Sequence, residues 1–453
     1  MSSLLEKIQE AGVIGCGGAG FPTHVKVGAK VERLLINCAE CEPILSADRF
    51  VMRHFAGQLV AAGAALMAQA GAAQCTFVLK AGYGPEREAL EAAIHASADA
   101  GGLGLHLLKG YYPAGDEQAV VYEATGRTVP PLNIPLQVGC AVVNTSTLLA
   151  IYNAMAGAPF THRFLSVDGA VRTPIILYAP LGLSFAECLE LAGGVDGDGA
   201  ALCLISGGPM MGKRFELSQA GGLFVEKTTS GVLALPKGAA LDRPLDMRRV
   251  RRAAKAACIQ CTNCTALCPR HLLGHPLEPH RIMRKLAYQE PAAILQDPVL
   301  QSAALCSECG VCEVYACPMG LKPRAVNALL KGMLAQAGMR YPRSEESTAP
   351  LSARAERLIP SKRVAARAGV AAYDHGPVDL LRRAEPSRVS IALKQGTGVP
   401  AQALVKEGDR VEAGACIARC PAGSLGAHVH ASIGGRVRAV GSHIVIAREE
   451  GQA

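Results

Sequence analysis

The chain contains no tryptophan, and aromatic residues make up only 4% of its 453 residues. Proteins that bind single-stranded nucleic acid stack bases on aromatic side chains, so this composition argues against that function. Positive charge is also modest, because the formal net charge is +8 at pH 7. Much of it lies in Met247–Lys255 and Arg354–Arg367, which we interpret as solvated helix faces and a linker, with a docking surface for an acidic protein or an anionic ligand as the alternative. We expect no nucleic-acid partner.

Targeting and membrane signals are missing as well. The N-terminus lacks the basic segment and apolar run of a signal peptide. The stretch from Phe55 to Leu79 is uncharged, but its apolar residues are mostly Ala and it contains three Gln, so membrane insertion is disfavoured. We interpret it as part of an Ala-rich helix, Ala47–Ala70, followed by a strand, Cys75–Ala81. The sequence predicts a cytoplasmic protein with no transmembrane segment.

Cysteine is abundant, with 17 residues, and no export signal accompanies them. This combination indicates metal binding rather than a disulfide framework. Eight of the cysteines fall into two tight groups. We expect most of the other nine to be small buried hydrophobic residues.

The pattern of apolar residues divides the chain into five segments. The first alternates strand-like and helix-like stretches, which predicts an α/β domain with a largely parallel, layered sheet. Short strands around one helix, Ser184–Ala192, predict a small α+β module. A helical segment carries the cysteine groups. The next segment is rich in Pro, Ser and charged residues, which predicts a linker or an extended arm. Short strands with Gly turns predict an all-β domain at the C-terminal end. The predicted boundaries are 1–158, 159–235, 236–342, 343–385 and 386–453.

The two cysteine groups have the spacing of ferredoxin-type runs. In each, three thiols at two-residue gaps can hold one [4Fe–4S] cluster, and a fourth, followed by Pro, turns away to the other cluster. Zinc is the alternative, but zinc motifs pair two Cys-x2-Cys units and need no third equally spaced Cys. A four-residue gap before the last Cys of the second group departs from the usual run. We predict two clusters, one on Cys258, Cys261, Cys264 and Cys317, the other on Cys306, Cys309, Cys312 and Cys268.

A dense glycine loop, Gly15–Lys26, lies near the N-terminus. Such loops let backbone N–H groups approach phosphates, although this one is not the dinucleotide fingerprint and a plain turn is the alternative. Three further polar segments follow predicted strands, at Asn37–Pro43, Tyr112–Glu117 and Asn144–Thr147. Because ligands of α/β proteins bind at strand ends, we predict a flavin or nucleotide pocket there. A general acid/base pair of Glu40 and Glu42 is the alternative.

These segments together resemble the FMN- and NADH-binding subunit of respiratory complex I, and more closely the C-subunit of the Rnf electron-transport complex. With the two cysteine runs and the all-β end, the whole chain resembles the cobalamin reductases of propanediol-utilization microcompartments. The resemblance implies a multidomain α/β protein: a Rossmann-like FMN/NADH domain, a β-grasp soluble-ligand-binding module, a helical ferredoxin-like domain and a C-terminal barrel-sandwich hybrid. It implies NADH stacking near Phe21, and FMN held by Gly15, Gly17, Gly18, Gly20, Lys26, Asn37, Glu40, Glu42, Gly115, Asp116, Glu117, Asn144 and Thr147.

The chain departs from related patterns in three places. Gly115-Asp116-Glu117 stands where the complex I motif has Gly-Glu-Glu. The C-terminal domain lacks the Met-Lys tip of lipoyl and biotinyl carriers, so a carrier role is not expected. No Asp-x-His-x-x-Gly corrinoid motif is present, so a corrinoid would bind only transiently.

The resemblance implies an NADH-dependent cobalamin reductase. NADH delivers two electrons as hydride and clusters accept one at a time, and a flavin converts between them. The expected order is NADH, FMN, first cluster, second cluster and cobalamin, with an adenosyltransferase as the next partner, inside a microcompartment in the cytoplasm. One alternative is an NADH:ferredoxin-type input subunit like the Rnf C-subunit. Another is an electron conduit docked to a microcompartment shell protein.

Overall fold

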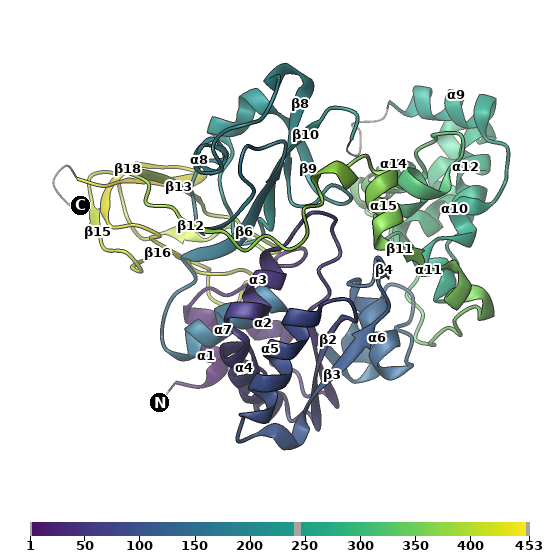
Figure 1. Ribbon diagram of the computed structural model, residues 1–453. Coiled ribbons are helices and arrows are strands. Elements are labelled where there is room, and N and C mark those ends of the chain that lie inside the picture. The colour runs from purple at the N-terminus through teal and green to yellow at the C-terminus, as the bar shows by residue number, and fades with distance from the viewer. Residues whose placement is uncertain (1, 240–245, 450–453) are drawn as a thin grey trace.

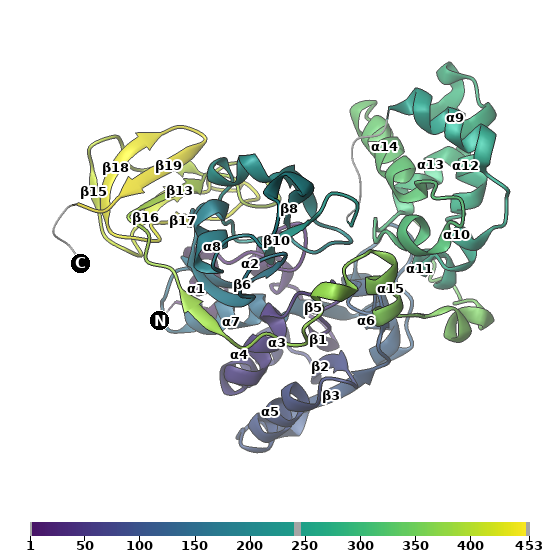
Figure 2. The same cartoon turned by 45° about the horizontal axis from the view of Figure 1, so that its top comes forward.

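A computed structural model describes residues 2–239 and 246–449. The N-terminal α/β domain and the small α+β module lie at the centre of the molecule, as Figure 1 shows. The helical domain with the cysteine groups lies to one side of them, and the C-terminal β domain lies on the opposite side (Figures 1 and 2).

The N-terminal domain is built on a four-stranded parallel sheet, as the alternating pattern predicts. Its strand order is β3-β2-β1-β5, with every neighbouring pair parallel. Strand β1 is apolar along its centre, because helices cover both faces of the sheet. The strands are β1 (Arg33–Asn37), β2 (Gln74–Lys80), β3 (Leu103–Leu108) and β5 (Cys140–Asn144).

Successive residues of β1 point to opposite faces of this sheet. Leu34 and Ile36 belong to one apolar cluster and Leu35 to another. The first cluster includes residues of α1 (Leu4–Glu10), α3 (Ala47–His54), α4 (Ala56–Ala70), α5 (Gly84–His95) and α7 (Thr145–Met155), and the second includes residues of α6 (Glu117–Thr125). The sheet is therefore the middle layer of a three-layer domain.

The single helix predicted over Ala47–Ala70 is wrong. Two helices, α3 (Ala47–His54) and α4 (Ala56–Ala70), meet at a 90° bend. At the break, Phe55 has non-helical dihedrals and its ring lies 5.2 Å from that of Phe164 in the next domain. Contact with the second domain thus accounts for the break. Within the described residues no single helix is long and apolar enough to cross a membrane, and α3 and α4 pass that test only as a bent pair.

The second domain packs a helix on a mixed sheet, as predicted. Helix α8 (Phe185–Leu191) begins at a capping box between Ser184 and Glu187. The sheet order is β12-β7-β6-β10-β8-β9, and β10 runs parallel to β6 but antiparallel to β8. These strands are β6 (His162–Gly169), β7 (Ile175–Pro180), β8 (Leu202–Ser206), β9 (Lys213–Glu216), β10 (Gly231–Pro236) and β12 (Leu381–Arg383).

The third domain is helical and surrounds the cysteine groups. Its apolar core forms mainly between helices α9, α12 and α14. Its helices are α9 (Met247–Ala257), α10 (Asn263–Ala266), α11 (Pro269–Leu272), α12 (Pro279–Tyr288), α13 (Pro298–Gln301) and α14 (Pro323–Gln336).

The arm that follows runs back across the first two domains. Its strand β11 (Ile359–Pro360) pairs with β4 (Tyr111–Tyr112), α15 (Ser361–Arg367) comes next, and β12 extends the sheet of the second domain. The arm therefore joins the domains by backbone pairing.

The C-terminal domain is all β, as predicted, and consists of two small sheets with orders β13-β19-β18-β15 and β14-β16-β17. Its strands enclose a separate apolar core. They are β13 (Arg388–Ala392), β14 (Gln402–Ala403), β15 (Arg410–Val411), β16 (Cys416–Arg419), β17 (Val429–His430), β18 (Gly435–Val440) and β19 (His443–Ala447).

Candidate functional site

The predicted polar segments meet at the carboxyl edge of the parallel sheet. Asn37 and Asn144 end neighbouring strands in matched register. The Thr145 hydroxyl donates to the Asn37 carbonyl at 3.1 Å, and Asn37 Nδ2 donates to the Gly115 carbonyl at 2.8 Å. The structure thus brings three of the four predicted segments together.

The glycine loop lies over the start of α7. The Cys16 amide donates to Thr147 Oγ1 at 2.8 Å, and a Cβ atom at Gly17 would lie 2.9 Å from Asn144 Nδ2. A Cβ at Gly18 would meet nothing within 4 Å, so the loop is open there. In the part of the chain that the structure describes, the amides of Gly17 and Gly18 donate to no protein acceptor. Free amides beside a helix N-terminus fit a phosphate group.

Lys26 lies across this site at the end of α2 (Thr23–Lys26). Its Nζ donates to Glu117 Oε1 at 2.6 Å, and both side chains are partly exposed. Asp116 instead caps α6 and accepts two hydrogen bonds from Arg270, at 2.8 and 2.9 Å. Of this acidic pair, Glu117 therefore faces the glycine-loop side, and Asp116 joins the N-terminal domain to the helical domain.

Glu40 and Glu42 occupy different surroundings. Burial, with Asp48 and Glu42 nearby, raises the pKa of Glu40 to about 8. Burial likewise raises the pKa of Glu42 to about 7, although Glu42 Oε2 accepts from the Met210 amide at 2.8 Å. A Cβ at Gly208 would overlap the Glu42 side chain, so the glycine turn of the second domain closes over this carboxyl group.

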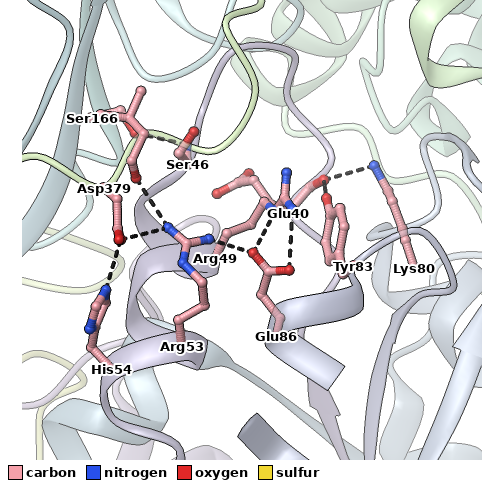
Figure 3. Close-up of polar contacts among 11 residues, drawn as sticks. Glu40, Ser46, Arg49, Arg53, His54, Lys80, Tyr83, Glu86, Ser166 and Asp379 are labelled. Atoms are coloured by element: carbon pink, nitrogen blue, oxygen red, sulfur yellow. Dashed lines mark hydrogen bonds and ion pairs between the residues drawn. The ribbon is translucent and has the colours of Figure 1, made fainter. Parts of the chain in front are cut away.

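A buried polar network holds the backbone of the Asn37–Pro43 segment in place (Figure 3). The Glu40 carbonyl accepts from Lys80 Nζ at 2.8 Å and from the Tyr83 hydroxyl at 2.9 Å. Arg49 lies 4.2 Å from the Tyr83 ring centroid and also pairs with Glu86. The position of this segment therefore depends on residues of α3, β2 and α5.

Phe21 follows the last glycine of the loop and is 38% exposed. The Gly15 amide donates to the Phe21 carbonyl at 2.9 Å, which closes the loop. An exposed ring at this position offers a stacking surface.

The C-terminal domain braces the glycine loop. The Thr397 amide donates to the Gly20 carbonyl at 3.1 Å, and Thr397 Oγ1 donates to the Ala19 carbonyl at 2.8 Å. A Cβ at Gly20 would lie 2.6 Å from Gly396 Cα, so the two backbones touch. Lys227 of the second domain joins the same corner, where its Nζ donates to the carbonyls of Gly12 and His428.

The cysteines of the first run lie together with Cys317 rather than with Cys268. Burial and the neighbouring thiols of Cys317, Cys258 and Cys261 raise the pKa of Cys264 to about 12. These four cysteines line one cavity. Between them, Gln260 and Thr262 adopt left-handed backbone conformations that let the chain wrap around the cavity.

The second run lies together with Cys268. Burial and the thiols of Cys306, Cys309 and Cys268 raise the pKa of Cys312. Burial also raises the pKa of Cys268 to about 11, with Cys306 contributing. The fourth thiols are thus exchanged between the runs, in the arrangement that the Cys-Pro spacing predicts. In the described ranges, no group of three or more His, Cys, Asp or Glu side chains is arranged to hold a single metal ion.

The second run has one more residue than usual between its last two cysteines, and a local change in the backbone accommodates it. A π-helical turn, Val311–Ala316, leads from Cys312 to Cys317. Because a π turn takes more residues than an α turn, the four-residue gap reaches the same place as the usual three. The Glu308 and Leu321 amides donate to the thiols of Cys306 and Cys317, both at 3.3 Å.

The second set of thiols lies against the N-terminal domain. The Tyr112 hydroxyl donates to the Cys309 carbonyl at 2.7 Å, and Arg270, two residues after Cys268, pairs with Asp116. These contacts of Tyr112 and Arg270 were not predicted from the sequence. For Arg270 the available signal was its position directly after Cys268-Pro269. The remaining nine cysteines are mostly buried, as predicted.

A glycine loop with free amides at a sheet edge and two sets of four thiols define a flavin- and iron–sulfur-dependent oxidoreductase. Family comparisons agree with this class. The Nuo51 FMN-binding domain matches residues 8–153, the SLBB domain 164–214, the 4Fe-4S dicluster domain 257–322 and the RnfC barrel sandwich hybrid domain 378–453. The predicted multidomain α/β fold class is confirmed.

Two relatives match nearly the whole chain. Cobalamin reductase PduS of Salmonella typhimurium is 42% identical over 97% of this chain and 95% of its own. Cobalamin reductase PduS of Citrobacter freundii is 41% identical over 96% and 94%. The protein belongs to the PduS cobalamin reductase family, which confirms the resemblance. A component of the Na⁺-translocating ferredoxin:NAD⁺ oxidoreductase complex of Acetobacterium woodii is 33% identical over 52% of this chain and 53% of its own.

Proposed function

We propose that this protein is an NADH-dependent cobalamin reductase that uses FMN and two [4Fe–4S] clusters. The observation that carries the proposal is the sorting of eight cysteines into two crossed sets, one of which lies against the domain of the glycine loop. The names of its relatives supply the acceptor, cobalamin.

The residues at the sheet edge fit FMN. We propose that the free amides of Gly17 and Gly18, with Lys26, hold its phosphate, and that Asn37 and Glu117 position the ring system. When bound, a flavin accepts a hydride and passes on electrons singly. We propose Glu40 as a group that can hold a proton near the flavin, because burial and the neighbouring Asp48 and Glu42 raise its pKa. The full proposed set is Gly15, Gly17, Gly18, Gly20, Lys26, Asn37, Glu40, Gly115, Glu117, Asn144 and Thr147. Asp116 and Glu42 are left out of the set, because Asp116 pairs with Arg270 and Glu42 lies under the turn at Gly208.

The proposed order of electron transfer reverses the order of the runs along the chain. Cys309 contacts Tyr112 of the N-terminal domain, whereas the set with Cys258 lies at the end of α9. We place the cysteine set that contains Cys268 and the second run next to the flavin. The other set, which contains Cys317 and the first run, lies beyond it. When clusters are bound, the amides that donate to Cys306 and Cys317 would favour their reduced state.

NADH is the proposed donor and stacks on the flavin from the side of Phe21, which is exposed at the loop. The proposed product is a reduced corrinoid for an adenosyltransferase, in a microcompartment of the cytoplasm. The second candidate function is an NADH:ferredoxin-type input subunit, which the similarity to the Acetobacterium woodii protein favours.

Anaerobic assay of the whole protein separates these two functions. With NADH as donor, we expect reduction of hydroxocobalamin to be faster than with free FMN and faster than reduction of ferredoxin. A cobalamin rate equal to that of free FMN contradicts the proposal, and a faster ferredoxin rate supports the second candidate.

Lys26→Ala is expected to lower the flavin content of the purified protein. The substitution removes the cation that pairs with Glu117 at the open side of the glycine loop. We expect about tenfold weaker FMN binding, measured by flavin fluorescence in titrations of the apoprotein. Lys109→Ala, at an exposed lysine beyond β3, is the matched control. Equal affinities of the two variants contradict the site.

Thr397→Val tests the brace between the C-terminal domain and the glycine loop. The substitution keeps the shape of the side chain but removes the donor to the Ala19 carbonyl. Loss of about 1 kcal/mol raises the FMN dissociation constant about fivefold. Thr397→Ser retains the hydroxyl and is expected to bind FMN like the wild type. Equal affinities of the Val and Ser variants would show that the hydroxyl does not act on the loop.

A further inference from the structure

A polar groove lies where three domains meet, beside the proposed flavin site, with which it shares only Cys16 and Ser146. It consists of two adjoining cavities of about 410 and 470 Å³, which is the size range of ligand pockets. Cys16 of the glycine loop, helix α7, the start of β6 and the C-terminal domain line the first cavity. The arm and the C-terminal domain line most of the second. His162, Tyr178, Ala413 and Ser432 line both, so the two cavities form one groove.

The groove is rich in positive charge. Arg163 is 5% exposed and lines the first cavity, where its guanidinium donates only to the backbone carbonyls of Lys227 and Phe164. In the part of the chain that the structure describes, no carboxylate lies within ion-pair distance of it, and Asp48 and Glu40 act on it only from farther away. Arg383 and Arg448 line the second cavity, against one acidic residue, Glu385. A buried cation that makes no direct ion pair is stabilised when an anion binds against it.

Two stacked rings stand at the junction of the cavities. The rings of His162 and Tyr178 lie 5.0 Å apart at an angle of 14°, and Arg383 lies 5.3 Å from the Tyr178 centroid. Burial lowers the pKa of His162 to about 4, so this ring is neutral at pH 7 and offers a flat, uncharged surface. Ring surface beside arginines suits a planar heteroaromatic group that carries a phosphate.

We propose that this groove binds a nucleotide, with its base against the His162–Tyr178 pair and its phosphate toward Arg163, Arg383 and Arg448. The inference adds a second ligand site to the proposed function and does not depend on the path of the electrons. Two molecules carry this chemistry: a free or dinucleotide adenylate, and cobalamin, whose tail is a nucleotide. Cobinamide, which lacks that tail, separates the two sources.

Equilibrium dialysis of the full-length protein, loaded with FMN, tests the site with AMP, cobalamin and cobinamide as probes. We expect AMP or cobalamin to bind, and Arg383→Ala to weaken that binding about tenfold. Arg382→Ala is the matched control, because Arg382 is also exposed but lines neither cavity. Arg383 is exposed, so its loss leaves the fold intact, and Tyr178→Leu provides a second variant that removes the ring surface.

The outcomes separate this site from the flavin site. Binding of AMP alone assigns the groove to an adenylate, and binding of cobalamin but not of cobinamide assigns it to the corrinoid tail. Equal binding of cobalamin and cobinamide without AMP binding overturns the inference, as do equal affinities of Arg382→Ala and Arg383→Ala. Loss of FMN from Arg383→Ala also overturns it, because the groove would then belong to the flavin site. Failure of cobalamin reduction with AMP binding retained would refute only the proposed function.

Discussion

Cys268→Ala is expected to remove the iron–sulfur cluster of the second cysteine run, although Cys268 belongs to the first run in sequence. The thiol of Cys268 lies with those of Cys306, Cys309 and Cys312, and Pro269 directs the following chain away into α11. A cubane that loses one of four thiolates is destabilised, so we expect iron to fall from about eight to about four atoms per chain. Iron analysis and low-temperature EPR of the reduced protein measure this.

The pairing of variants makes the crossed arrangement testable. Cys268→Ala and Cys306→Ala should leave the same remaining EPR signal, that of the cluster on the first run. Cys317→Ala and Cys258→Ala should share the other signal. Cys420→Ala, in the C-terminal domain, is the control and should retain both. If Cys268→Ala instead shares its signal with Cys258→Ala, each run holds its own cluster and the crossed assignment is wrong.

The same variants test the order of electron transfer. If the set of Cys268 stands next to the flavin, its loss blocks transfer to the other cluster as well. NADH would then still reduce the flavin of Cys268→Ala, while the remaining cluster would be reduced at least about tenfold more slowly. Stopped-flow absorbance follows both steps. Unchanged reduction of the remaining cluster would place that cluster, and not the one on Cys268, beside the flavin.

Local chemistry made these thiol sets predictable from the sequence. Spacing of two residues and a Cys-Pro step act within a few residues, and the structure places the thiols as that spacing requires. The π-helical turn at Val311–Ala316 was not predictable, because whether an extra residue loosens a site or is absorbed depends on the helix packed around it.

The parallel sheet was predictable for the same kind of reason. Apolar runs such as Leu34–Ile36 are buried on both faces, and strand ends bring Asn37 and Asn144 together. The bend at Phe55 was not, because Gly57 alone does not distinguish a break from a continuous helix, and Phe164, which Phe55 contacts, lies more than 100 residues away along the chain.

Contacts between domains escaped sequence analysis. Asp116 was expected at the flavin, yet its carboxylate pairs with Arg270, and Glu42 lies under the turn at Gly208. A sequence motif identifies the residues that lie near a site. It does not show which side chain of another domain each of them contacts after the domains pack together. The pairing of Thr397 with the glycine loop is of the same kind, since nearly 380 residues separate them.

Glu86→Ala is expected to be strongly destabilising, because it removes the centre of the network in Figure 3. The Glu86 side chain is fully buried and accepts from Arg49 at 3.0 and 3.2 Å and from Arg53 at 2.5 Å. Without it, two largely buried guanidinium groups lose their shared carboxylate. Breaking a buried pair from one side reduces the free energy of unfolding by about 3–5 kcal/mol. Urea denaturation followed by circular dichroism measures this.

Asp379→Ala is the matched control, because Asp379 pairs with the same Arg53 but its side chain is 58% exposed. An exposed pair contributes at most about 1 kcal/mol, so the two variants should differ by at least about 2 kcal/mol. Similar losses in both would mean that burial of Glu86 does not control the network.

Glu86→Gln connects this network to the flavin. The variant keeps the volume of the side chain but removes the charged partner of Arg49, while Arg53 keeps Asp379, so Arg49 is freed to shift from the Tyr83 ring. Tyr83 holds the Glu40 carbonyl, and that contact positions the segment that begins at Asn37. We therefore expect Glu86→Gln, but not Asp379→Ala, to weaken FMN binding. If stability falls while flavin affinity is unchanged, the network supports the fold alone and the Lys80 contact suffices to position the segment.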